Sequence, residues 1–115
     1  MAQKSQMLKG NVALLILAAV AREPAHGYAI SRSIADASEG YFDMKEGTLY
    51  AHLHELEHDG LLTSSWDLAS GRPRRYYKVT DNGLRKLAAQ RAEWEAFAGG
   101  MNRALNALSP QTGEA

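Results

Sequence analysis

The chain has 115 residues, of which 45% are hydrophobic, and this is enough for a single small domain. It contains no cysteine, which excludes disulfides and thiolate metal sites and leaves the redox compartment unindicated. The 13 basic residues equal the 13 acidic residues, so net charge alone gives no argument for nucleic acid.

Charge is unevenly distributed along the chain. Residues 72–91 contain seven basic residues and one acidic residue, Asp81. Residues 36–59 contain seven acidic residues and one basic residue, Lys45. A basic segment can hold phosphates while the whole chain stays neutral. Residues 72–91 are therefore the first candidate for an anion contact.

The first predicted helix covers residues 7–22 and is rich in strong helix formers. Its apolar run, residues 12–21, follows Lys4 and Lys9 and is also the outline of a signal peptide. The run is too short to span a membrane. We favour a buried helix in a cytoplasmic protein over export. Glu23 ends the helix, because the residue before a proline is pushed out of the α region.

A turn at residues 25–27 precedes a second helix, residues 28–37, and a connector at residues 38–44. The third helix begins at Lys45. Leu49, Leu53 and Leu56 repeat at i, i+4 and i+7, which predicts one buried face. Gly60 is placed to end this helix.

The opposite side of the third helix carries Gly47, Ala51, His54 and His58, which we call the free face. Thr48 and Tyr50 flank it. Small, hydrogen-bonding and aromatic residues suit a helix that enters a DNA groove. Seen in isolation, a solvated amphipathic helix explains the same pattern, and the basic segment downstream favours the groove.

Two strands are predicted at residues 61–68 and 75–79, joined by a Gly/Pro turn at residues 69–74. Arg72, Arg74 and Arg75 surround Pro73, so this hairpin can reach phosphates or a narrow minor groove. The alternative is a solvated basic hairpin. Three helices and a hairpin in this order predict a winged helix–turn–helix in residues 1–80.

Thr80 is expected to cap a final helix, residues 81–108, and residues 109–115 are expected to be disordered. Hydrophobic positions in this helix alternate steps of three and four, with Arg91 as the charged exception. Such a seam predicts a two-fold dimer. Its members are Leu84, Leu87, Trp94, Ala98, Met101, Leu105 and Leu108. The fold class is thus mainly α with a two-stranded β wing and a C-terminal dimerisation helix.

Two features of the final helix leave alternatives open. Gly99-Gly100 is a weak point at which the helix could bend or another helix could approach closely. Trp94 and Phe97 could line a ligand cavity at the dimer interface, although aromatic residues more often serve as interface core.

His54-Glu55-Leu56-Glu57-His58 fits the H-E-x-x-H pattern of zinc peptidases and places both histidines on one helical face. A catalytic zinc also needs a third protein ligand, and no histidine follows His58. Only a carboxylate such as Glu93 or Glu95 could supply it. A zinc-dependent hydrolase is therefore kept as an alternative function, as is a dimeric interaction module that never binds DNA. We expect no enzyme, no metal and no cofactor.

An ordered set of motifs resembles the PadR family of bacterial transcriptional regulators over residues 8–108. The motifs are Pro24-Ala25-His26-Gly27-Tyr28, Glu46-Gly47-Thr48-Leu49-Tyr50, Leu56-Glu57 with Gly60-Leu61-Leu62, Gly71-Arg72-Pro73-Arg74 with Tyr76-Tyr77, and Thr80 with Gly83. The single final helix resembles the short subfamily. The chain departs from the family at Ala51, where relatives often have proline, and at His54 and Glu55, where they often have basic residues.

The resemblance implies a dimeric winged-helix repressor whose third helix enters the major groove of double-stranded DNA. We expect phosphate contacts from Lys45, Tyr50, Arg72 and Arg74, with His54 donating to phosphate when protonated. Thr48 and His52 are expected nearer the bases. In some relatives aromatic or cationic ligands bind near the dimer interface and release DNA. Trp94 sits where such relatives place an aromatic side chain.

Overall fold

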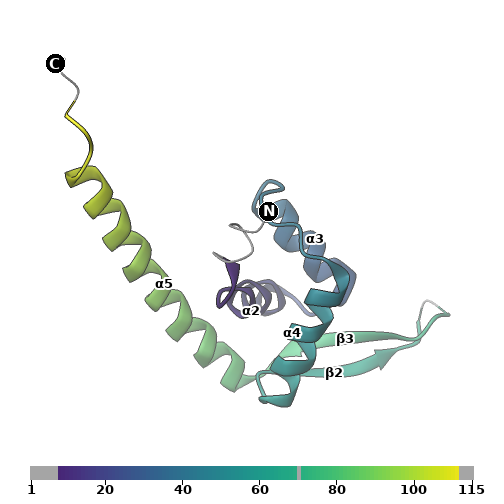
Figure 1. The fold of residues 1–115 in the computed structure, drawn as a ribbon. Coiled ribbons are helices and arrows are strands. Elements are labelled where there is room, and N and C mark those ends of the chain that lie inside the picture. The colour runs from purple at the N-terminus through teal and green to yellow at the C-terminus, as the bar shows by residue number, and fades with distance from the viewer. Residues whose placement is uncertain (1–7, 70, 112–115) are drawn as a thin grey trace.

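The computed structural model describes residues 8–69 and 71–111. Its elements follow the order α2 (Val12–Arg22), β1 (Ala25–His26), α3 (Gly27–Ala37), α4 (Glu46–His58), β2 (Leu62–Asp67), β3 (Arg74–Val79) and α5 (Asp81–Ala107). Figure 1 shows α2, α3 and α4 gathered at the base of the hairpin, with α5 leaving on one side and the hairpin on the other. The expected winged helix–turn–helix with a long C-terminal helix is confirmed.

The hydrophobic core closes between the three helices and the base of the sheet. We call α2 through β3 the body. Each of its helices presents one apolar face, so the repeats at three and four residues converge on a common centre. The buried side chains are Val12, Ile16, Leu17, Val20, Ile30, Ile34, Leu49, Leu53, Leu56, Leu62 and Tyr77. The apolar run that also resembled a signal peptide supplies four of these side chains from α2.

The first predicted helix, residues 7–22, is interrupted by a turn at residues 9–11. Leu8 is helical, but Gly10 adopts a left-handed φ of 88°, and the Asn11 amide bonds back to the Leu8 carbonyl at 2.8 Å. This turn interrupts the helix, and α2 begins only at Val12. The predicted start at Met7 lies outside the described residues. Among those residues, no helix is long and apolar enough to cross a membrane.

The sheet has three strands in the order β1-β3-β2, one more than the two-stranded wing that was predicted. The wing itself, β2 and β3, is confirmed, with Leu62 opposite Val79 at its base and Asp67 opposite Arg74 towards its tip. In place of the expected turn at residues 25–27, Ala25 and His26 form β1, which pairs Ala25 with Tyr77 and His26 with Tyr76, and Gly27 begins α3. This pairing fastens the start of α3 to the wing.

Helix α5 runs through Gly99-Gly100 without a break. Its start is fixed by Thr80, whose hydroxyl accepts a hydrogen bond from the Gly83 amide at 2.9 Å, so the predicted cap is confirmed. Residues 109–111 form neither helix nor strand, and the rest of the predicted disordered tail lies outside the described residues.

Candidate nucleic-acid interface

Helix α4 is held by its leucines and leaves the opposite side open. Leu49, Leu53 and Leu56 are buried against the core, whereas all four residues of the free face are exposed. Lys45 and Thr48, at the start of the helix, are exposed as well. The predicted division of this helix into a core face and a free face is therefore confirmed.

Tyr50 connects α4 to the beginning of α3. Its ring lies against Gly27 so closely that a Cβ atom at Gly27 would stand 2.6 Å from the tyrosine hydroxyl oxygen. Tyr50 is half-buried by this contact, and Gly27 is buried. The two motifs that contain Gly27 and Tyr50 are thus one packing unit, because only glycine leaves room for the ring.

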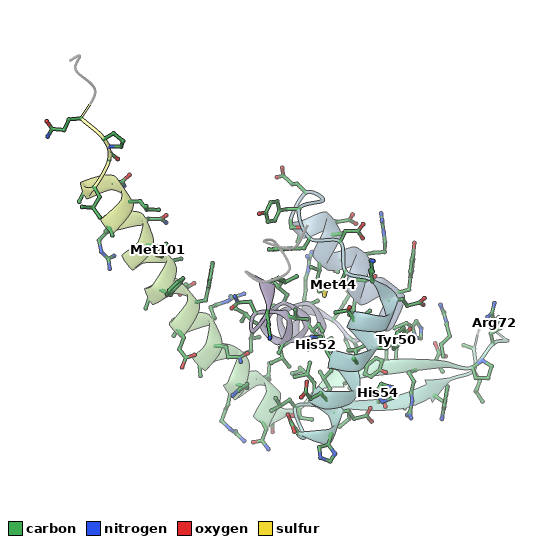
Figure 2. The ribbon with its side chains drawn as sticks, in the orientation of Figure 1. Met44, Tyr50, His52, His54, Arg72 and Met101 are labelled. Atoms are coloured by element: carbon green, nitrogen blue, oxygen red, sulfur yellow. The ribbon has the colours of Figure 1, made fainter. Side chains whose placement is uncertain are left out.

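His52 lies on a different side of α4 from Tyr50 and His54. Figure 2 shows Tyr50 and His54 on the side from which the wing extends, and His52 on the side of α2. His52 is half-buried and lines a hollow of about 190 Å³ together with Leu17 from α2 and Lys86 from α5. The sequence placed it nearer the bases, whereas the structure places it towards the junction with α5.

The two wing arginines selected from the sequence lie at the far end of the hairpin. Arg72 and Arg74 are both exposed, and Figure 2 shows Arg72 at the tip, well away from helices α2, α3 and α4. Because side chains alternate along a strand, Leu62, Ser64, Trp66, Arg75 and Tyr77 share one surface of the wing. Ser64 bonds to Glu57 of α4, so this surface, which we call the inner face, is turned towards α4.

His26 anchors the other surface of the wing, and no motif in the sequence indicated its partners. Its Nε2 lies 3.1 Å from a carboxylate oxygen of Asp67, and its Nδ1 lies 3.1 Å from the Arg75 carbonyl oxygen. The imidazole also packs on the Tyr76 ring at 5.2 Å between centroids. Since both polar partners are acceptors, the imidazolium form can donate to both at once. His26 is therefore a structural hydrogen-bonding residue.

Tyr77 is the largest fully buried side chain of the core. Burial raises the pKa of its hydroxyl above the usual 10.0, because a phenolate would lose its hydration. The negative charge of Glu57 and the neighbouring Tyr50 raise this pKa further, and the Arg75 guanidinium acts in the opposite direction. The tyrosine therefore stays neutral where the wing meets α4.

A second hollow, of about 250 Å³, lies where α5 passes the start of α2. Trp94 and Phe97 line it with their rings 6.1 Å apart, and Glu93 and Gln90 supply polar groups. The Gln90 Oε1 atom is buried and has no hydrogen-bond partner within residues 8–69 and 71–111. Trp94 and Phe97 are 44% and 61% exposed, so this wall is open in the single chain.

The zinc-peptidase pattern does not gather a ligand set. His54 and His58 are both exposed on α4. Within residues 8–69 and 71–111, no three histidine, aspartate or glutamate side chains come together in a way that could hold a metal ion. A catalytic zinc needs three protein ligands. The two histidines belong to the free face instead.

The fold and this surface define a winged helix–turn–helix protein with a long C-terminal helix. The sequence profile of the transcriptional regulator PadR-like family matches residues 16–89, and the chain belongs to this family. It is therefore a transcriptional regulator and not an enzyme. PadR regulators bind DNA and typically dimerise.

Individual relatives agree with this assignment. A transcriptional regulator of Mycobacterium tuberculosis is 38% identical over 90 residues, which cover 78% of this chain and 81% of the relative. The crystal structure of a PadR family transcriptional regulator from Eggerthella lenta matches with a TM-score of 0.79 and 36% identity, covering 90% of this chain and 89% of that one. A transcriptional regulator from Clostridium thermocellum gives a TM-score of 0.79 at 28% identity, covering 85% and 96%.

Proposed function

We propose that the chain is a homodimeric repressor that binds a two-fold symmetric DNA operator through α4 and the wing. The observation that carries this proposal is the exposed free face of α4 beside a hairpin that carries exposed cations, with Arg72 at its tip away from the helices. A helix fits the major groove, and cations on a flanking hairpin suit the phosphate backbone. The alternative of an interaction module leaves this pairing unexplained.

The residue roles follow from exposure. Lys45, Arg72 and Arg74 are exposed cations for phosphates, and Tyr50 offers a hydroxyl beside the start of α3. His54 on the free face donates to phosphate when it is protonated. Base contact by His52 remains a prediction, but its place in the hollow beside Lys86 favours Thr48 as the side chain nearest the bases.

Dimerisation is proposed to occur through α5. Leu84, Trp94, Met101, Leu105 and Leu108 are 44% to 78% exposed, and Ala98 and Leu87 are half-buried. A second copy would bury this apolar seam about a two-fold axis. Residues 1–80 would then form the DNA-binding unit and residues 81–108 the dimerisation helix, in a cytoplasmic protein with access to DNA.

We also propose that the hollow at Trp94 and Phe97 accepts a small aromatic or cationic effector that releases DNA. Aromatic rings attract cations, and the Glu93 carboxylate beside them adds a complementary charge. The buried Gln90 Oε1 supplies an acceptor that has no donor among the residues that the structure describes. A ligand with an N–H or O–H group would satisfy it.

Fluorescence anisotropy of labelled DNA from upstream of the chain's own gene, measured over a salt series, tests the proposal. We expect nanomolar affinity, a steep loss of affinity with salt, and far weaker binding to scrambled DNA. Arg74→Ala should weaken binding to every sequence and reduce the salt slope by about one, because a phosphate contact carries no base information. Arg85→Ala, an exposed cation on α5, is the matched control and should change binding less.

Three experimental results would contradict different parts of the proposal. Equal affinity for operator and scrambled DNA would reduce the function to nonspecific binding by the basic wing. Absence of binding at low salt would support the interaction module instead. If Arg74→Ala alters the preference at one base only, the arginine reads sequence and its phosphate role is wrong.

A further inference from the structure

A chain of side-chain contacts runs from α4 into the wing. The Ser64 hydroxyl donates to the Glu57 carboxylate at 2.7 Å, and the Arg75 Nη1 group donates to the Ser64 oxygen at 2.9 Å. The Arg75 guanidinium in turn lies 4.7 Å from the centre of the Trp66 ring. Helix α4, β2 and β3 are thus joined by one relay: Glu57, Ser64, Arg75 and Trp66.

The relay ends at Trp66, an aromatic side chain that is not buried in the core. On the inner face, Leu62 and Tyr77 are each 1% exposed at the base of the wing, whereas Trp66, further out, is 60% exposed. Trp66 stands directly opposite Arg75 in the register of the two strands. Opposed side chains on one face of an antiparallel pair contact each other, so the stack follows from the pairing.

The stack has the chemistry of a nucleic-acid contact. An indole presents a flat apolar surface to a sugar or a base, and a guanidinium carries five N–H donors, which one bond to Ser64 does not exhaust. Stacking on Trp66 and bonding to Ser64 fix the direction of the guanidinium before any partner arrives. Less side-chain entropy is then lost on binding.

We propose that Trp66 and Arg75 form a further DNA-contacting surface on the inner face of the wing, with Glu57 and Ser64 as positioning residues. The ligand is the sugar–phosphate backbone that flanks the groove entered by α4. Trp66 packs on deoxyribose and Arg75 bonds to a phosphate. Because Glu57 belongs to α4 itself, the relay sets the wing at a fixed distance from the free face. This inference rests on the proposed DNA-binding function.

The first test compares DNA affinity of the full-length protein by anisotropy. Trp66→Ala should weaken operator binding roughly tenfold, the effect of losing one good aromatic contact. Tyr41→Ala removes an exposed aromatic side chain outside the wing and serves as the control. DNA should also change the tryptophan emission of the wild-type protein, and Trp66→Phe should abolish that change, leaving only the signal of Trp94.

The second test separates positioning from mere stability. Ser64→Ala cuts the relay and should weaken operator binding by roughly threefold to tenfold while the unfolding transition stays near that of Ser65→Ala, a control on the opposite face of the same strand. Ser64→Thr restores the hydroxyl and should restore affinity. Free Ser64→Ala protein should show lower tryptophan emission anisotropy than Ser65→Ala, since Trp66 is then less restrained.

The possible outcomes test the inferred surface, the positioning role and the proposed function separately. If the wild-type protein binds operator but Trp66→Ala binds equally well, the inferred surface is wrong and the proposed function stands. If Ser64→Ala matches Ser65→Ala in affinity, the positioning role is wrong. If the wild-type protein binds no DNA, the proposed function fails before the inference is reached.

Discussion

The body and α5 differ in how far they bury their apolar side chains within the single chain. In the body, side chains such as Ile16, Leu17 and Leu53 reach 0% exposure within a single chain. In α5, the one buried residue is Gly83 and Leu105 is 60% exposed, and Leu108, just after the helix, is 78% exposed. The body therefore buries most of its apolar side chains within one chain, whereas α5 leaves an apolar seam exposed.

The shape of the molecule follows from this difference. The chain measures 66 × 27 × 21 Å, because α5 extends beyond the body rather than folding back across it (Figure 1). Most helical stability in proteins comes from packing an apolar face. A helix of 27 residues with an unpacked seam is thus expected to gain its stability from a second copy.

The largest predicted effect contrasts one leucine from each region. Leu53→Ala opens a cavity in the body and should lower the free energy of unfolding by about 2–5 kcal/mol. Leu105→Ala truncates an exposed side chain and should change the stability of the isolated monomer by less than about 0.5 kcal/mol. The same Leu105→Ala change should weaken the dimer. Urea unfolding and sedimentation equilibrium measure the two quantities.

Protein concentration is the control, since dimerisation adds to apparent stability. Both variants are therefore compared with the wild-type protein at matched dilution. An unchanged dimer dissociation constant for Leu105→Ala would mean that the seam of α5 is not the interface. A small loss of stability for Leu53→Ala would mean that the core closes elsewhere.

The sequence predicted the elements whose signals are local. The spacing of Leu49, Leu53 and Leu56 located α4 and its free face, and Thr80 located the start of α5. Strand β1 was missed because two residues carry no alternating pattern, and their pairing with β3 depends on where α3 packs. The turn at Gly10 was missed because Met7 and Leu8 before it and the apolar run after it read together as one helix.

The site was predicted less completely than the fold. Exposed cations such as Arg74 were identified from charge, whereas the position of His52 depends on how α5 leaves the body. The partnership of Glu57, Ser64 and Arg75 is formed between separate elements, so no single motif contains it. Strand alternation from the apolar Leu62 could have placed Ser64 and Trp66 on one face, which is the signal that was available.

The next largest predicted effect concerns the junction between the body and α5. Thr80 accepts from the Gly83 amide at the start of α5, and its hydroxyl donates at 2.7 Å to the carbonyl of Gly60, just beyond α4. Thr80→Ala should destabilise the protein by about 1 kcal/mol through loss of the helix cap. Thr80→Ser keeps the hydroxyl and should retain most of the stability. Equal urea midpoints for the two variants would show that the hydroxyl contributes nothing at this joint.

The smallest effect is a pH dependence that belongs to the body alone. Because burial first, and then Glu57, raise the pKa of Tyr77 in the folded chain, folding favours the neutral hydroxyl. This stabilisation is complete below the unfolded pKa of 10.0 and is lost as the pH rises through the higher pKa of the folded state. Urea unfolding above pH 10 should therefore show a loss of stability that Tyr77→Phe reduces. Tyr28→Phe, which alters a tyrosine that is 70% exposed, should keep the wild-type slope. Identical slopes for both variants would place the alkaline sensitivity outside the Tyr77 environment.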